Sequence, residues 1–186
     1  METNKVVQNK QNYILDKEKE IEFKGVNFKY FNSEIPLLEN VNFNIPKNSH
    51  TIITGPNGSG KSTILGLLAG IYYPDSGKVF TYSENFGYIG ATPLIFESSI
   101  RDNILYGNTK GISDKKIINF LKRLDTFKEE KSYNLENTIN NRSLSSGQMQ
   151  KIAFVRAILN EPDILLLDEA TANLDEVSRA EIFKIL

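Results

Sequence analysis

Eight consecutive residues, Gly55 to Ser62, have the spacing of a loop that binds phosphate groups. The segment G-P-N-G-S-G-K-S fits the pattern G-x-x-x-x-G-K-[ST], in which glycines let successive backbone N–H groups turn toward one anion. Lys61 would contact the β- and γ-phosphates of a nucleotide, and the hydroxyl of Ser62 could coordinate Mg²⁺. An ordinary glycine turn ahead of a helix is the alternative. The expected nucleotide contacts are Gly55, Pro56, Asn57, Gly58, Ser59, Gly60, Lys61, Ser62 and Thr63.

Two carboxylates, Asp168 and Glu169, follow a run of four apolar residues at 164–167. Such a run is typical of a strand buried on both faces, and ligands gather at the carboxyl ends of parallel strands. We expect Asp168 to hold Mg²⁺ and Glu169 to orient and deprotonate an attacking water. An acidic pair that only caps the next loop is the alternative, but a phosphate-binding loop in the same chain favours catalysis.

A third segment, Leu144 to Gln148, reads L-S-S-G-Q and lies about 20 residues before the apolar run. Small residues at the start of a helix would let Ser145, Gly147 and nearby backbone donors approach a γ-phosphate. A serine that only caps the helix is the alternative for an isolated segment of this kind.

Together the three motifs resemble those of ATP-binding cassette (ABC) ATPases, whose signature is usually written L-S-G-G-Q and whose Walker B motif is similar to 164–169. The resemblance covers the chain from about Ile21 to Leu186 and implies Mg²⁺-dependent hydrolysis of ATP. In the family the signature faces ATP held by a second copy, so the resemblance implies a head-to-tail dimer. It also implies that Ala172 to Asp175, which is similar to the D-loop, reaches across that dimer. The residues implied in trans are Ser145, Ser146, Gly147, Gln148 and Asp175.

Two further segments match the family. Tyr30, about 25 residues before Gly55, is similar to the aromatic residue that stacks on adenine, although a single tyrosine at a strand end is more often a core or surface residue. Phe96 to Ile104 is similar to the stretch that opens the helical subdomain of exporter-type cassettes. The resemblance therefore implies the ATPase motor of a membrane exporter. Its partner would be a transmembrane transporter domain, which would attach it to the cytoplasmic face of a cell membrane.

The sequence also departs from the family's pattern. Ala91 stands where the Q-loop glutamine is expected, which predicts weakened coupling to a transport domain or a substitute ligand such as Thr92. Residues 138–142 lack the glutamate common in exporters. No counterpart of the family's switch histidine follows the D-loop, and the only histidine, His50, is expected to be structural. We therefore expect a chain cut short at its C-terminus.

The elements needed to hold these residues predict an α/β fold. It has a P-loop NTPase core with an N-terminal antiparallel β lobe and an inserted α-helical subdomain. The core sheet would use residues near 45–95 and 160–186, with the helical subdomain at about 97–158. Residues 1–20, rich in polar side chains, predict a linker, and the ABC domain would span 21–186.

Alternating apolar residues predict an entry hairpin, and a β-branched run at 50–54 predicts a strand beside 164–167. Helical periodicity predicts helices over 62–70, 113–124 and 147–159.

Composition excludes several classes of protein. Acidic and basic residues nearly cancel, 23 against 22, so we expect no nucleic acid partner. The chain has no cysteine, which excludes disulfides and thiolate zinc sites and is typical of a reducing compartment. Ile64 to Tyr73 is too short to span a membrane, which takes about 20 apolar residues. Two rival functions stay open: a soluble ABC ATPase that drives no transport, and a regulatory nucleotide-binding module with little hydrolysis.

Overall fold

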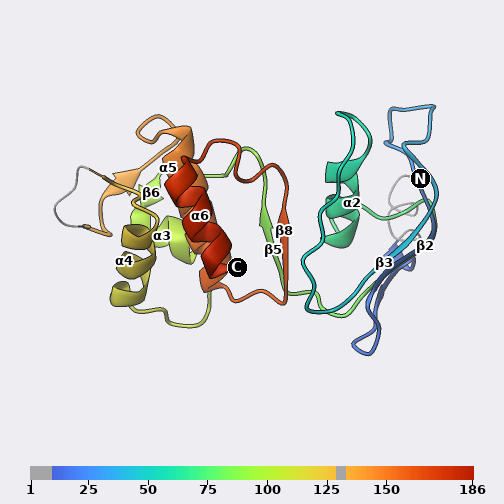
Figure 1. Cartoon of the computed structure of the whole chain (residues 1–186), viewed down its shortest axis with the longest axis horizontal. Coiled ribbons are helices and arrows are strands. Elements are labelled where there is room, and N and C mark those ends of the chain that lie inside the picture. Colours follow the sequence, from blue (N-terminus) through green and yellow to red (C-terminus); the bar gives the residue numbers. More distant parts are fainter. Residues whose placement is uncertain (1–9, 129–132) are drawn as a thin grey trace. The chain divides into compact units, whose positions relative to one another are not determined.

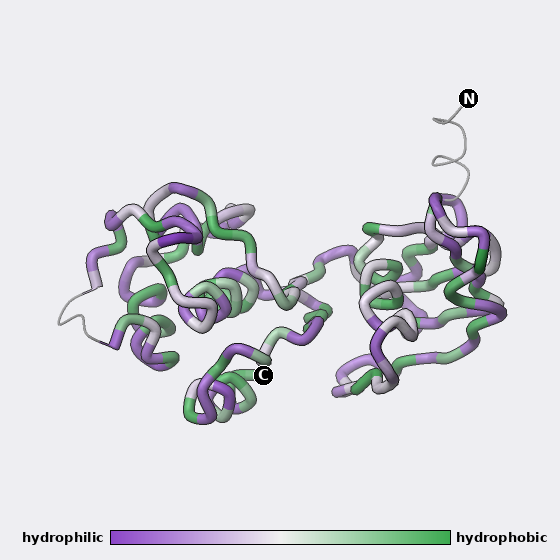
Figure 2. Tube along the Cα trace, turned by 90° about the horizontal axis from the view of Figure 1, so that it is seen from above, coloured by the Kyte–Doolittle hydropathy of each residue, from purple (hydrophilic) through white to green (hydrophobic). Residues whose placement is uncertain are grey.

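The computed structural model describes residues 10–128 and 133–186 of the chain. These residues form two compact units, Met1–Phe86 and Gly87–Leu186. Figure 1 shows the elements of each unit, and Figure 2 shows hydrophobic and hydrophilic segments alternating along the chain in both. Residues 1–9, which are part of the linker predicted over 1–20, and residues 129–132 lie outside the described residues.

The first unit is built on a four-stranded sheet in the order β1-β4-β2-β3. Strands β2 (Ile21–Phe28) and β3 (Leu38–Ile45) are antiparallel, and Phe23 lies opposite Phe43 with its ring stacked on it at 4.4 Å. This confirms the predicted entry hairpin. Strand β4 (Ser76–Thr81) pairs antiparallel with β2 on its other side.

The ordered fold begins earlier than the sequence predicts. Residues 13–15, placed in the polar linker, form strand β1 (Tyr13–Leu15), which runs parallel to β4. Tyr13 anchors this strand because its hydroxyl donates to the carbonyl of Leu68 at 2.8 Å and its ring packs edge-on against Tyr73. Burial raises the pKa of Tyr13 to about 12, so the hydroxyl keeps its proton. One well-placed aromatic residue and a backbone ladder thus order a segment whose composition is polar.

Helix α2 (Lys61–Leu68) follows the phosphate-binding loop, close to the prediction of 62–70. The predicted strand at 50–54 is wrong for this structure, because these residues belong to none of its strands and Ile52 is 86% exposed. A β-branched run favours a strand, but only ladder hydrogen bonds to a neighbour make one. His50 accordingly lies exposed outside any strand. The placement of 50–54 beside 164–167 stays a prediction.

The residues described in the second unit form two short sheets. Strand β5 (Phe86–Ile89) pairs with β8 (Ile164–Leu167), and β6 (Ser98–Ser99) pairs antiparallel with β7 (Thr138–Ile139). In β8 buried residues alternate with half-buried ones, so the apolar run is covered more on one face than on the other.

Four helices complete the described part of this unit: α3 (Ile100–Leu105), α4 (Asp114–Arg123), α5 (Ser146–Leu159) and α6 (Glu176–Ile185). The Ser113 side chain caps α4, as its position predicts. Helix α5 is buried on nearly all sides and carries the middle of the core, which includes Ile104, Ile117, Leu121, Ile152 and Phe154. Within 10–128 and 133–186, no helix combines the length and apolar character needed to cross a bilayer.

Candidate functional site

The predicted phosphate-binding loop lies at the surface of the first unit. Residues 55–59 are exposed, and a turn within them closes with the Ser59 amide donating to the Pro56 carbonyl at 3.3 Å. The Lys61 ammonium donates to the carbonyls of Gly55 at 3.0 Å and Pro56 at 2.9 Å. The loop therefore curls around the lysine, which lies within hydrogen-bond distance of two loop carbonyls.

Gly60 sets the point where the loop becomes a helix. It caps α2 with φ of 93°, a left-handed conformation that glycine adopts without the cost other residues incur. A Cβ there would also lie 3.0 Å from Leu38. Ser62 is exposed in the first turn of α2. Its hydroxyl would therefore lie close to a phosphate group bound at the N-terminus of this helix.

Tyr30 lies beside this helix. Its hydroxyl is 2.8 Å from Oγ1 of Thr63, a buried residue in the first turn of α2. The Tyr30 ring packs edge-on against Phe28 and Tyr72, at 5.1 Å and 5.6 Å between centroids. Tyr30 nevertheless stays 41% exposed, so part of this residue is accessible next to the first turn of α2.

The two carboxylates follow β8 in the second unit. The Asp168 amide donates to the carbonyl of Ile89 at 2.9 Å, and one carboxylate oxygen of Asp168 accepts from the hydroxyl of Tyr88 at 3.0 Å. Glu169 is exposed and has φ of 53°, in the left-handed region that costs a residue with a side chain about 1 kcal/mol. The chain therefore turns at Glu169, directly after Asp168.

The signature segment opens α5 through a capping box. The Ser145 side chain accepts from the Gln148 amide at 3.2 Å, while the Gln148 side chain accepts from the Ser145 amide at 2.9 Å. Because the Ser145 oxygen is used as an acceptor, its O–H proton is available for an outside acceptor. Ser145 and Ser146 are both exposed, so this helix end is accessible.

Asp175, predicted to act across a dimer, also has partners within its own chain. It caps α6, with one carboxylate oxygen accepting from the Ser178 amide at 2.9 Å. The other oxygen lies 2.9 Å from the Ser178 hydroxyl and 3.2 Å from the Lys151 ammonium. The Ser178 amide, above all, and the Ser178 hydroxyl and Lys151 hold the pKa of Asp175 well below its usual range.

Three functional candidates were missed by sequence reasoning: Tyr88, Gln150 and Lys151. Gln150 is fully buried and donates to the carbonyl of Gly90 at 3.2 Å, next to the exposed Ala91. Lys151 is buried beside it in α5. A signal for both exists, because a helix that is apolar nearly all round must be buried and any polar residue within it needs a partner.

The structure brings the predicted residues together in two groups. Tyr30 and Thr63 meet beside the phosphate-binding loop in the first unit, and the signature meets the D-loop in the second, where a Cβ on Gly147 would lie 3.0 Å from the carbonyl of Asn173. The approach of Asp168 and Glu169 to the phosphate-binding loop stays a prediction.

Comparison with known proteins identifies the family. The sequence profile described as ABC transporter matches residues 38–172. The ABC multidrug transporter mdr4 of Aspergillus fumigatus is 37% identical over 182 residues, which cover 87% of this chain and 14% of that protein. The chloroplastic ABC transporter B family member 26 of Arabidopsis thaliana is 35% identical over 181 residues, covering 89% of this chain and 26% of that protein.

A solved structure shows the same fold. The structure of a bacterial Atm1-family ABC exporter with ATP bound superposes with a TM-score of 0.78 at 26% identity. It covers 94% of this chain and 33% of that protein chain, and the match confirms the predicted α/β fold class. The chain spans no more than about a third of the length of these relatives.

Proposed function

The chain belongs to the ABC transporter family, and on this premise we propose that it binds and hydrolyses ATP to drive substrate translocation by an exporter-type ABC transporter. The observation that carries the proposal is the loop from Gly55 to Ser62, which curls around Lys61 and opens α2 at a left-handed glycine. Exposed amides, a cation and a helix N-terminus at one point match the charge of a triphosphate.

Tyr30 supplies the base-binding part of the proposed site. Its exposed ring lies next to the first turn of α2, so a nucleotide whose phosphates contact the loop would have its adenine near an aromatic face. The hydrogen bond to Thr63 fixes the distance between the two binding elements.

Mg²⁺ fits the proposed site as an ion that protein oxygens and phosphate oxygens would bind together. Among the described residues there is no group of three or more acidic, histidine or cysteine side chains able to hold a metal alone. Mg²⁺ in nucleotide sites is usually held by one or two protein oxygens together with phosphate oxygens, and Ser62 and Asp168 are suited to that role. Bound there, the ion would neutralise charge that develops on the phosphates.

Glu169 would act on the water that attacks the γ-phosphate. Its carboxylate is exposed, follows the proposed Mg²⁺ ligand directly and leaves the strand at a sharp turn, so it can face substrate while Asp168 faces the metal. The backbone cost at Glu169 is consistent with a position kept for function, since strain of this kind is concentrated at active sites.

A second cassette would complete the site. The exposed helix end at Ser145 and Ser146 has a dipole and a hydroxyl proton suited to a γ-phosphate. A head-to-tail dimer would bring these donors, together with Gly147, Gln148 and the D-loop, to ATP bound by the partner. The relatives named above are transporters or an exporter, which supports a transmembrane transporter domain as the other partner and a membrane surface as the location.

The test measures ATP binding and phosphate release by the purified chain, with and without Mg²⁺. We expect saturable ATP binding and Mg²⁺-dependent release of phosphate. Asp168→Asn should bind ATP but lose most of the Mg²⁺ dependence, while Asp163→Asn, an acidic residue just before β8, is the matched control. Failure to bind ATP would overturn the proposal, and binding without any phosphate release would favour a regulatory module instead.

A further inference from the structure

The D-loop and the signature helix are joined by a buried cation. Lys151 lies in α5, five residues after Ser146, and only 5% of its side chain is exposed. Its ammonium is 3.2 Å from a carboxylate oxygen of Asp175 and 3.2 Å from the carbonyl of Asp125, just beyond the end of α4. A buried ammonium needs such partners, because leaving it unpaired is costly.

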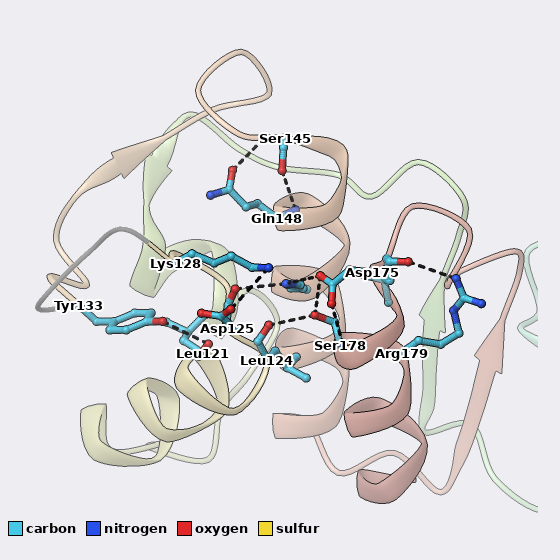
Figure 3. A network of polar contacts seen from close by, with 12 residues as sticks. Leu121, Leu124, Asp125, Lys128, Tyr133, Ser145, Gln148, Asp175, Ser178 and Arg179 are labelled. Carbon is cyan, nitrogen blue, oxygen red and sulfur yellow. Dashed lines mark hydrogen bonds and ion pairs between the residues drawn. The ribbon is translucent and has the colours of Figure 1, made fainter.

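Three segments far apart in the sequence meet at this point. Figure 3 shows Asp175 and Ser178, at the start of α6, close to Leu124 and Asp125, at the end of α4. The Ser178 hydroxyl lies 3.4 Å from the carbonyl of Leu124, so α6 touches the end of α4 both directly and through the lysine. The capping box of Ser145 and Gln148 opens α5, the helix that also contains Lys151.

A close backbone approach adds to this polar link. Gly147 in the signature has no side chain, and a Cβ there would lie 3.0 Å from the carbonyl of Asn173 in the D-loop. The signature helix and the D-loop therefore make one contact where Gly147 approaches Asn173 and another where Lys151 pairs with Asp175. The two segments are thus in contact at two separate points.

We infer that Lys151 is a positioning residue, which holds Asp175 and so fixes the D-loop against the signature helix, making the two segments move as one body toward the partner's nucleotide. The inference rests on the proposed function, because the D-loop and the signature act on ATP only in a dimer of cassettes. Lys151 itself contacts no nucleotide: its effect passes through Asp175.

The test compares Lys151→Met, which keeps most of the length and removes the charge, with Lys151→Arg, which keeps the charge. We expect Lys151→Met to lower kcat for ATP hydrolysis at least about tenfold, since misplacement by about 1 Å can cost up to 10²-fold. The Kd for ATP should change less than about twofold, because the phosphate-binding loop is untouched. Lys151→Arg should restore most of the rate.

Lys116→Met is the matched control, because it removes the same charge from an ion pair with Glu161 that is about half exposed and includes no residue of the D-loop or the signature. It should leave kcat and Kd as in the unmodified chain. Hydrogen exchange gives an independent measurement that needs no hydrolysis: Lys151→Met should speed exchange at the D-loop amides of Ala172 and Leu174, which donate to the carbonyls of Glu169 and Thr171. Lys116→Met should not.

An unchanged kcat in Lys151→Met would overturn the inference. So would faster exchange throughout α5 and α6 with loss of ATP binding, since that pattern indicates a purely structural lysine. If the unmodified chain binds ATP but releases no phosphate, the proposed hydrolysis fails by itself. The exchange measurement still decides the inference in that case, and exchange at Ala172 and Leu174 unchanged by Lys151→Met contradicts it.

Discussion

The phosphate-binding loop and the region where the signature meets the D-loop differ in the source of their hydrogen-bond partners. Partners in the first region would come largely from a ligand, and those in the second come from the chain itself. Residues 55–59 are exposed, and the Lys61 ammonium bonds only with carbonyls of its own loop among the contacts described. Around Asp175, by contrast, an amide, a hydroxyl and a buried ammonium from the same chain satisfy the carboxylate. The first region offers donors to a ligand, whereas the second is already organised by the chain.

This difference predicts which measurements each region controls. Removing a donor that serves a ligand should weaken binding and leave folding unchanged, because few internal contacts are lost. Removing a partner from a satisfied internal network should destabilise the fold, because the remaining group is left buried and unpaired. The substitutions below test this contrast in order of expected effect.

Substitutions at Glu169 test whether a residue of the second unit can affect activity without affecting stability, as expected for the phosphate-binding loop. Glu169→Gln should lower the rate of phosphate release by about 10²–10⁴-fold, the usual contribution of a general base. Its free energy of unfolding should not change, because glutamine has the same backbone conformation. Glu169→Gly should instead gain up to about 1 kcal/mol of stability by relieving the positive φ, while also losing activity. Urea unfolding and a phosphate assay check both, and a Glu169→Gln chain that still turns over ATP would show that another group is the base.

Asp175 should show the opposite behaviour. Asp175→Ala removes a helix cap and leaves the Lys151 ammonium without its carboxylate, so we expect a loss of about 2–4 kcal/mol in the free energy of unfolding. Asp175→Asn keeps a good cap and should lose less. ATP affinity should change little in either variant. An Asp175→Ala chain as stable as the unmodified one would break the contrast between the two regions.

The same carboxylate makes stability depend on pH. The folded pKa of Asp175 lies below its unfolded value of about 3.9, so its contribution is fully present above that value and is lost as pH falls toward the folded pKa. Asp175→Asn should therefore be less sensitive than the unmodified chain to a fall in pH from about 5 to 3. Thermal unfolding at a series of pH values measures this, and equal slopes for both chains would contradict it.

Local signals explain most of what the sequence predicted correctly. The helices at 114–123 and 146–159 were predictable because their caps, Ser113 and Ser145, and their apolar spacing lie within a few residues of each other. The strand expected at 50–54 was not decided locally, since a strand depends on a neighbour elsewhere in the chain. The same holds for β1, which depends on pairing with β4 across more than 60 residues.

The sequence predicts which residues form the motifs of the candidate site. It does not predict which other residues of the chain bond with them. The phosphate-binding loop and the signature are contiguous, so their spacing is visible in the sequence. The pair of Lys151 and Asp175 joins residues 24 apart that no motif connects, and the bond from Tyr30 to Thr63 spans 33 residues. Tertiary packing alone sets these contacts.

Lys61 tests the region that offers its donors to a ligand. Lys61→Ala should weaken ATP binding about 10–100-fold, because a charge-assisted contact with phosphate contributes about 1.5–3 kcal/mol. Its stability should change by less than about 0.5 kcal/mol, since the two carbonyls that it contacts are exposed and can bond with water. Calorimetric titration and thermal unfolding measure the two quantities. Lys47→Ala, a lysine of the same unit outside the loop, is the control.

Gly147 tests how tightly the signature and the D-loop fit together. Gly147→Ala places a Cβ 3.0 Å from the carbonyl of Asn173, so the D-loop must shift by a few tenths of an ångström. The gain in helix propensity, up to about 1 kcal/mol, should offset the cost and leave the net stability nearly unchanged. Hydrolysis should nevertheless fall several-fold. A phosphate assay and urea unfolding measure the two quantities, and an unchanged rate of hydrolysis would contradict a tight fit between the two segments.

Tyr30→Phe is expected to give the smallest effect, and it tests whether an internal hydrogen bond helps to organise the region around the phosphate-binding loop. Tyr30→Phe keeps the aromatic face and the packing against Phe28 and Tyr72 but removes the hydroxyl that bonds Thr63. One neutral hydrogen bond contributes about 0.5–1.5 kcal/mol, so ATP affinity should fall less than about tenfold. Tyr30→Ala removes the face as well and should cost more, by about 1–3 kcal/mol if the ring stacks on the base. If both variants weaken ATP binding equally, the hydroxyl carries the whole effect, and Tyr30 would then organise α2 rather than bind adenine.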